Sequence, residues 1–252
     1  MPLALLALTI SAFAIGTTEF VIVGLVPTIA DQLAISLPSA GLLVSIYALG
    51  VAIGAPVLTA LTGRLPRKQL LLGLMVLFTA GNMLAWQAPD YTTLIIARLL
   101  TGLAHGVFFS IGSTIATSLV PKEKAASAIA IMFGGLTVAL VTGVPLGTFI
   151  GQHFGWRETF LAVSLLGVIA LISSQLLIPS SIPGRAAATL CDQLKVLTHP
   201  RLLMIYAITA LGYGGVFYGV HFPGADDAGP GRIFTQRRQL DPARIRRLGG
   251  DR

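Results

Sequence analysis

Long apolar segments alternate with short polar ones along most of the chain. Seven segments of about 20 residues are rich in Leu, Ala, Ile, Val and Gly: 3–25, 41–62, 69–87, 93–119, 127–150, 158–178 and 201–221. A helix of about 20 apolar residues crosses a hydrocarbon core of about 30 Å, whereas a strand of a membrane barrel needs only about 10. The pattern therefore predicts an all-α membrane protein with seven spanning helices.

The composition supports this prediction and excludes other classes. Hydrophobic residues make up 54% of the 252 residues and charged residues 11%, against about 25% charged in soluble domains. The first segment is interpreted as a retained helix because it has no basic start and contains Glu19. The one cysteine, Cys191, excludes a disulfide framework. We predict no cofactor and no metal.

Positive charges lie mainly in every second loop. The loops after the second, fourth and sixth segments hold eight basic residues, and the opposite loops hold only Arg157. Because cytoplasmic loops carry an excess of Lys and Arg, the distribution predicts a cytoplasmic N-terminus. Membrane orientation therefore accounts for the basic residues, and the net charge of +7 does not require nucleic-acid binding. Trp86 and Trp156 fall at the outer ends of their segments, where tryptophan favours the interface.

Residues 223–252 break the pattern. They contain seven Arg and four Asp and have almost no hydrophobic periodicity. One interpretation is a disordered tail; the other, which we favour, is an out-of-frame or non-native continuation, because the change comes directly after an apolar segment. The predicted organisation is a six-helix bundle, a cytoplasmic loop, a seventh helix and this tail: 1–178, 179–200, 201–222 and 223–252.

Two charged residues lie inside the apolar segments. Glu19 and Arg98 are each about six residues from the outer end of their segment, which puts them at similar depth. A charge near the bilayer centre costs at least ~2.5–3.5 kcal/mol, so each is a functional candidate. The two could pair, directly or through water. The alternatives are a static salt bridge, or an arginine that reaches the outer interface.

His105 follows Arg98 by seven residues, so Arg98, His105 and Gly112 share one line along their helix. His105 is either a proton carrier or a hydrogen-bonded packing residue. Ser110, the nearest nucleophile, lies about 140° around the helix from His105, so the two cannot act together. The sequence therefore does not predict an enzyme.

Small residues and proline mark two further segments. Gly143, Gly147 and Gly151 share one helix face, with Pro145 between them, and Gly102 and Gly106 repeat the spacing. Such faces allow close helix packing, and the proline predicts a bend where a half-domain could flex. The basic turn Arg64, Arg67 and Lys68 either sets topology alone or also pairs with cytoplasmic helix ends.

Four stretches together resemble a known family: GTTEFVIVGLVPTIA (16–30), LTGRLPRK (61–68), RLLTGLAHG (98–106) and GGLTVALVTGVPLGTFIG (134–151). GWRETF (155–160) is also similar. Residues 1–222 resemble the N-terminal half of a major facilitator superfamily transporter of the drug/proton antiporter branch, the arabinose efflux permease type. The resemblance implies six helices in two three-helix repeats, followed by a seventh.

The resemblance also implies roles for individual residues. Glu19 matches the acidic position of the first-helix motif and Arg98 the arginine of the fourth-helix motif, both linked to proton coupling. Gly143, Pro145 and Gly147 match the antiporter motif of the fifth helix, whose bend governs interconversion between states. Arg64, Arg67 and Lys68 match the basic part of the loop motif between the second and third helices.

The chain departs from the family pattern in two ways. The loop motif usually has an Asp before its first Arg and a Gly four residues earlier; here these are Gly63 and Thr59. Complete members have twelve helices, so half of the cavity wall would have to come from a second half-transporter or a homodimer.

The resulting prediction is a secondary transporter in a bacterial inner membrane that exports a drug or sugar by proton antiport. The alternative is a fragment that inserts into the bilayer and transports nothing. Asn82 and Gln175 are the few polar groups expected in an otherwise apolar lining, which suits lipophilic drugs without excluding sugars.

Overall fold

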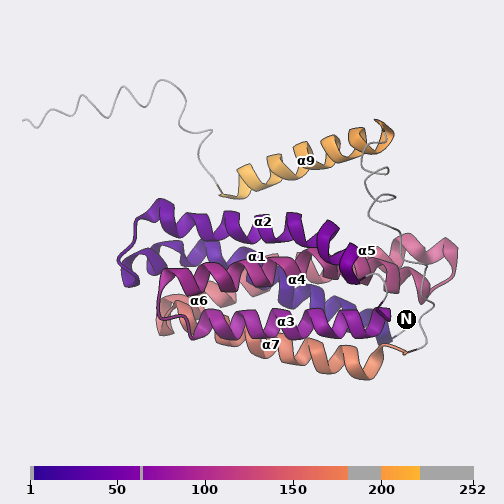
Figure 1. The fold of residues 1–252 in the computed structure, drawn as a ribbon, viewed down its shortest axis with the longest axis horizontal. Helices are drawn as coiled ribbons and strands as arrows, with labels where there is room; N and C mark the ends of the chain where they lie inside the picture. The colour runs from indigo at the N-terminus through magenta and orange to yellow at the C-terminus, as the bar shows by residue number, and fades with distance from the viewer. Residues whose placement is uncertain (1–2, 63–64, 181–199, 222–252) are drawn as a thin grey trace, which may run out of the picture. The chain divides into compact units, whose positions relative to one another are not determined.

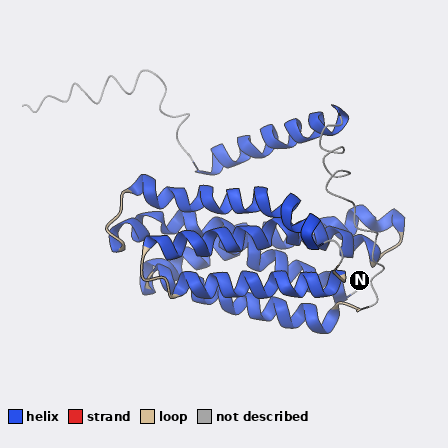
Figure 2. Ribbon diagram, in the orientation of Figure 1, coloured by secondary structure: helices blue, strands red, loops and turns tan. Residues whose placement is uncertain are grey.

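The computed structural model describes residues 3–62, 65–180 and 200–221. Within these residues every regular element is a helix (Figure 2). The predicted tail 223–252, most of the loop 179–200, and Arg64 lie outside the described residues. The chain divides into two compact units, 1–194 and 195–252.

The first unit is a bundle of long helices that run along a common direction (Figure 1). They are α1 (Leu3–Gln32), α2 (Leu37–Thr62), α3 (Arg67–Trp86), α4 (Tyr91–Ser118), the 3₁₀ turn η1 (Lys122–Lys124), α5 (Ala125–Val138), the π-helix η2 (Ala139–Gly143), α6 (Val144–Phe154) and α7 (Trp156–Leu177). Six spans in this unit are long and apolar enough to cross a membrane, with η1 to α6 forming one of them. The prediction of six spanning helices is confirmed.

The second unit contributes one described element, α9 (Pro200–His221). It is the seventh predicted helix, and residues Leu202–Gly212 form its apolar stretch. Its large apolar side chains are exposed within this unit, for example Leu211 at 78%.

The interior of the bundle is apolar and holds two clusters of buried side chains. One cluster lies around Leu8, Phe78 and Phe108, and the other around Leu25, Leu94 and Trp156. The helices present small residues where they meet, because backbones can approach closely only where no bulky side chain intervenes. At Gly50 the backbones of α2 and α4 lie so close that an added Cβ would be 2.7 Å from the Leu99 carbonyl oxygen.

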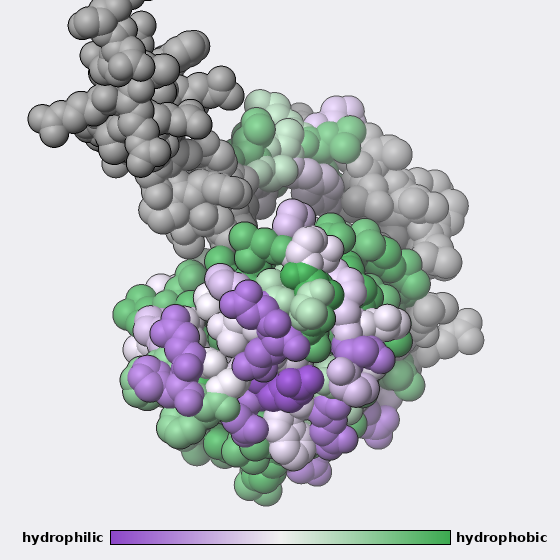
Figure 3. All heavy atoms as spheres, turned by 90° about the vertical axis from the view of Figure 1, so that its left-hand side faces the viewer, coloured by the Kyte–Doolittle hydropathy of each residue, from purple (hydrophilic) through white to green (hydrophobic). Residues whose placement is uncertain are grey.

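The end of the bundle that carries the α1–α2, α3–α4 and α6–α7 connections is polar, and apolar side chains surround it (Figure 3). Side-chain hydrogen bonds help to hold this end together. Arg157 donates from Nη2 to the Ala88 carbonyl at 2.8 Å, and Trp86 Nε1 donates to Glu158 at 3.4 Å. The turn into α7 uses Gly155, whose φ of 106° is the left-handed region that suits glycine.

Trp156 differs from the sequence prediction. It is fully buried and packs on Phe160, with the Arg157 guanidinium 4.3 Å above its ring. It therefore belongs to the core and is not an interfacial ring. Trp86 is partly exposed. Sequence position alone could not separate the two, because the rotation of a helix decides which side of it faces the core.

Candidate functional site

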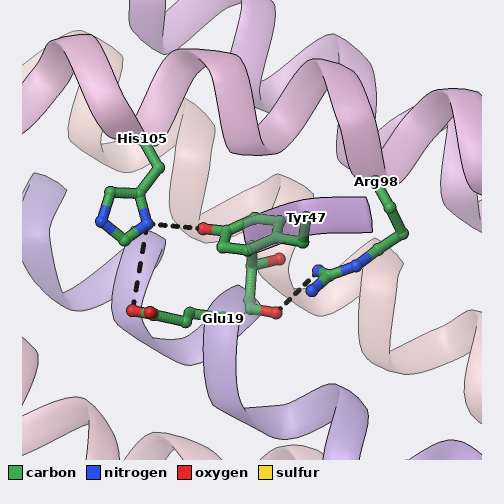
Figure 4. A network of polar contacts seen from close by, with 5 residues as sticks. Glu19, Tyr47, Arg98 and His105 are labelled. Atoms are coloured by element: carbon green, nitrogen blue, oxygen red, sulfur yellow. Dashed lines mark hydrogen bonds and ion pairs between the residues drawn. The ribbon is translucent and has the colours of Figure 1, made fainter. Parts of the chain in front are cut away.

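The predicted residues Glu19, Arg98 and His105 lie in one region of the bundle interior (Figure 4). Glu19 comes from α1, and Arg98 and His105 from α4. Tyr47 of α2, which the sequence analysis did not single out, lies between them. Four residues from three helices therefore form one polar group inside an apolar bundle.

Close packing of α2 against α4 brings Tyr47 into this group. Gly102 lies midway along α4, and a Cβ there would collide with the Tyr47 carbonyl oxygen. At Gly106, one turn further along α4, an added Cβ would likewise collide with the Val51 carbonyl oxygen of α2. The expectation of tight packing at Gly102 and Gly106 is confirmed, and its consequence is that the Tyr47 ring reaches both Arg98 and His105.

Arg98 is 1% exposed and binds the backbones of two other helices. Its Nη1 donates to the Thr18 carbonyl at 2.9 Å and its Nε to the Leu43 carbonyl at 3.3 Å. The guanidinium also lies 4.1 Å from the centre of the Tyr47 ring. A planar cation suits this arrangement because it can donate in its plane while its face rests on an aromatic ring. Arg98 does not reach the outer interface.

Glu19 forms its ion-pair contact with His105 and not with Arg98. The Glu19 Oε2 and His105 Nδ1 atoms are 3.9 Å apart, too far for a hydrogen bond. A direct Glu19–Arg98 pair is not among the contacts of the described residues; Arg98 Nη1 and Nε donate instead to the backbone carbonyls of Thr18 and Leu43. Glu19 Oε2 and Arg98 Nη2 are buried without a hydrogen-bond partner among the described residues.

His105 is hydrogen-bonded to Tyr47. The Tyr47 hydroxyl and His105 Nδ1 are 2.8 Å apart, and the two rings meet edge to face. The side chains of Glu19 and His105 are 18% and 12% exposed, whereas Tyr47 is 2% exposed. The acid and the imidazole therefore reach the surface of the bundle, with the tyrosine and the arginine behind them.

Tyr47 could have been suspected from the sequence. It is a hydroxyl-bearing residue in the apolar segment 41–62, and buried Tyr hydroxyls usually find a partner. Asn82 also differs from its predicted place in a lining. It is buried, accepts from the Thr18 hydroxyl and donates to the Phe78 carbonyl. Asn82 therefore ties α1 to α3.

Gly112, predicted on the same line of α4, serves packing. A Cβ on it would lie 2.9 Å from Met132 Sδ of α5. No group of three or more His, Cys, Asp or Glu side chains in the described part of the chain could hold a metal ion.

The fifth span is interrupted at the predicted proline. The π-helix η2 ends at Gly143, and α6 starts with Pro145 in its first turn. Proline has no N–H to donate to the preceding turn, and π-turns occur where the ordinary ladder is broken. Gly143, Gly147 and Gly151 face α1, where an added Cβ would collide with the side chains of Thr17, Val21 and Leu25, in that order. The broken segment is thus packed closely against the helix that carries Glu19.

The basic turn between α2 and α3 contacts the end of α7 through Lys68. Lys68 Nζ donates to the Gln175 carbonyl at 2.8 Å, near the C-terminal end of α7. A cation at a helix C-terminus is favoured by the helix dipole. Arg67 begins α3 at the same end, and Arg64 lies outside the described residues.

Comparison with known proteins identifies similar chains. Residues 8–229 match the sequence model of the Major Facilitator Superfamily. An uncharacterized MFS-type transporter of Bacillus subtilis, YtbD, is 58% identical over 85% of this chain and 54% of its own length. A chloramphenicol resistance protein of Streptomyces lividans is 36% identical over 88% of this chain and 57% of its own.

A solved structure supports the fold. The crystal structure of the peptide transporter POT in complex with sulfate superposes with a TM-score of 0.66, at 13% identity, over 89% of this chain and 47% of that one. This similarity concerns the fold alone. The chain spans about half the length of the curated relatives it matches.

Proposed function

The chain belongs to the major facilitator superfamily, and on this premise we propose that its bundle is one half of a secondary transporter that exports a small solute, a drug or a sugar, in exchange for protons. Transporters of this superfamily bind substrate between two six-helix halves. The bundle would line one side of that site. A second half-transporter, or a second copy of this chain, would line the other side.

The observation that carries the proposal is the ionisable group Glu19, Arg98 and His105 inside membrane-spanning helices. Ionisable side chains at such depth are costly and usually mark ion or proton pathways. A purely architectural salt bridge would satisfy both partners. Here Glu19 Oε2 and Arg98 Nη2 have no hydrogen-bond partner among the described residues. Glu19 Oε2 can therefore accept a proton, and Arg98 Nη2 can donate to a water or a substrate.

The difference in exposure suggests a division of roles. The side chains of Glu19 and His105 are partly exposed, so each could exchange a proton with water between the two halves of a complete transporter. Arg98 is buried and supplies a fixed positive charge nearby. One proton on Glu19 or His105 changes the charge of the pair by one unit. This change would shift the inward/outward equilibrium only to the extent that the two states bind the proton differently.

The broken fifth span is the proposed bending element. Gly143, Pro145 and Gly147 lie where η2 meets α6 and where the backbone packs on α1. A π-turn already lacks the regular ladder, so a change in bend angle there breaks fewer hydrogen bonds than in an intact helix. The segment would then transmit a change at Glu19 to the position of α6.

The basic turn is the proposed cytoplasmic gate. The bond from Lys68 to the end of α7 supports a role in holding α3 to α7 on that side, and Arg64 and Arg67 would add to it. The expected location is a bacterial cell membrane, the inner one where there are two, with the N-terminus in the cytoplasm.

A transport assay with a matched pair of variants tests the proposal. The chain would be reconstituted in liposomes, alone and fused to the C-terminal half of YtbD, with an imposed proton gradient. Chloramphenicol is the first substrate to test, because a relative is named for resistance to it. We expect Glu19→Gln to abolish gradient-driven transport and Glu123→Gln, an exposed carboxylate of η1, to leave it unchanged.

The possible outcomes separate the two candidate functions. Transport by the fusion that survives Glu19→Gln would remove Glu19 from the coupling mechanism. Insertion without transport of any drug or sugar, by the chain alone and by the fusion, would favour the non-functional fragment.

A further inference from the structure

Tyr47 is the residue of the polar group for which the proposed function gives no role. Its hydroxyl lies 2.8 Å from His105 Nδ1. The same nitrogen faces Glu19 Oε2 at 3.9 Å. One atom of His105 therefore has two oxygen neighbours on two other helices, one within hydrogen-bond distance and one just beyond it.

The direction of the Tyr47–His105 hydrogen bond follows because the hydrogen of the buried Tyr47 hydroxyl needs an acceptor. Tyr47 is 2% exposed, and an unmet buried donor is costly. Within the described residues the only hydrogen bond of its hydroxyl is the one to His105. If the hydroxyl donates, Nδ1 carries the lone pair and the proton of neutral His105 is on Nε2.

The surroundings of His105 keep this pair together. Gly102 brings the α2 backbone against α4. The Arg98 guanidinium covers the Tyr47 ring, and Phe109 packs on the imidazole with ring centres 4.9 Å apart. The ionisable groups around it are Glu19 from α1, Tyr47 from α2 and Arg98 from α4; α5 (Ala125–Val138) contributes none.

Resting on the proposed function, we propose that Tyr47 is a positioning residue that holds neutral His105 as the Nε2–H tautomer and apart from Glu19. When a hydronium ion transfers a proton to the Nδ1 lone pair, its O–H bond breaks, a water molecule leaves, and an N–H bond forms at Nδ1. Nδ1 can then no longer accept from the tyrosine, whose hydrogen stays on its own oxygen. The imidazolium becomes a donor, and Glu19 Oε2, which lacks a hydrogen-bond partner, is the acidic acceptor within reach.

The test reads the tautomer directly and needs no transport. The full chain, labelled with ¹⁵N-histidine and reconstituted in lipid nanodiscs, would be studied by NMR above the titration range of histidine. It has four histidines, and a His105→Asn spectrum identifies the signal of His105. We expect the Nε2–H tautomer in the unsubstituted protein. We expect Tyr47→Phe to lower its ratio to the Nδ1–H tautomer about fivefold, the effect of one ordinary hydrogen bond.

Tyr91→Phe is the matched control. It removes a hydroxyl that donates to the Ser39 carbonyl, and we expect the His105 tautomer to be unchanged. An Nδ1–H tautomer in the unsubstituted protein would overturn the proposal even if Tyr47→Phe fails to fold. A folded Tyr47→Phe protein with an unchanged ratio would overturn it too. A tautomer result as expected, combined with export that is independent of protons, would reject only the proposed function.

Discussion

Arg98 contributes to the bundle through its shape as well as its charge. It donates to carbonyls on α1 and α2 while its face covers Tyr47. A lysine keeps the charge but has no planar fork, so it cannot make these contacts together. We expect Arg98→Lys to lower the free energy of unfolding by about 1.5–3 kcal/mol, the scale of one hydrogen bond to a charged group.

The midpoint of thermal unfolding in detergent would measure this effect. Arg67→Lys, at the half-buried start of α3, is the matched control: among the described residues the Arg67 side chain makes no hydrogen bond to another helix, so the midpoint should be unchanged. Equal midpoints for Arg98→Lys and the unsubstituted protein would contradict a structural role for the guanidinium.

Asp90, outside the spans, has a simpler role as the N-cap of α4. Its carboxylate accepts from the Thr93 N–H at 2.7 Å, and this bond lowers the pKa of Asp90 below its ordinary value of 3.8. A carboxyl with a lowered folded-state pKa stabilises the fold above its unfolded-state pKa, and the stabilisation is lost as the pH falls through the folded-state value.

The N-terminal turn of α4 should therefore loosen as the medium becomes more acid than pH 4. Hydrogen exchange of the Thr93 amide, corrected for its intrinsic pH dependence, would report this loss. Asp90→Asn can still cap the helix and should remove the dependence on acid. A dependence that persists in Asp90→Asn would assign it to another group.

The close contact between α2 and α4 depends on Gly102. An alanine at position 102 would collide with the α2 backbone at Tyr47, and overpacking of this kind costs about 1–3 kcal/mol. We expect Gly102→Ala to destabilise the bundle and to weaken the Tyr47–His105 hydrogen bond.

Gly73→Ala in α3 is the control, because a Cβ there meets nothing within 4 Å. Alanine favours a helix over glycine by up to about 1 kcal/mol, so this variant should be as stable as the unsubstituted protein or more so. If both variants unfold at the same midpoint, close packing at Gly102 is not what holds α2 to α4.

The fifth span illustrates what an element's sequence can and cannot predict. Pro145 and the glycines predicted a bend in a closely packed helix, and in the structure the segment is divided into α5, η2 and α6. That the break takes the form of a π-turn over Ala139–Gly143 was not predictable. Gly143 of η2 packs against Thr17 of α1, and Gly147 and Gly151 of α6 pack against Val21 and Leu25. Such contacts with another helix are not specified by the sequence of this segment.

Charge separates the two ends of the whole bundle. Among described residues, the end with the N-terminus carries Arg67, Lys68, Lys122, Lys124 and Glu123, a net +3 (4 − 1). The end in Figure 3 carries Arg157, Asp31, Asp90 and Glu158, a net −2 (1 − 3). By the positive-inside rule we expect the first end to face the cytoplasm.

Cysteine accessibility would check this orientation. In a Cys191→Ser background, Ser36→Cys lies in the exposed α1–α2 connection and Glu123→Cys in the exposed turn η1. A membrane-impermeant maleimide applied to spheroplasts should label position 36 and not position 123, and should label both after permeabilisation. The opposite labelling would reverse the orientation.

Composition and residue spacing were enough to predict the six spanning helices of the bundle, the charge asymmetry and the family resemblance, because each depends on the order of residues along the chain. The sequence also singled out Glu19, Arg98 and His105, since charged and titratable residues are rare inside apolar segments. Their partners were decided only by the tertiary structure. Arg98 binds a carbonyl 80 residues away and His105 a hydroxyl 58 residues away. Such pairs depend on how each helix is rotated and on how closely glycines let two backbones approach. The sequence of a single helix determines neither property.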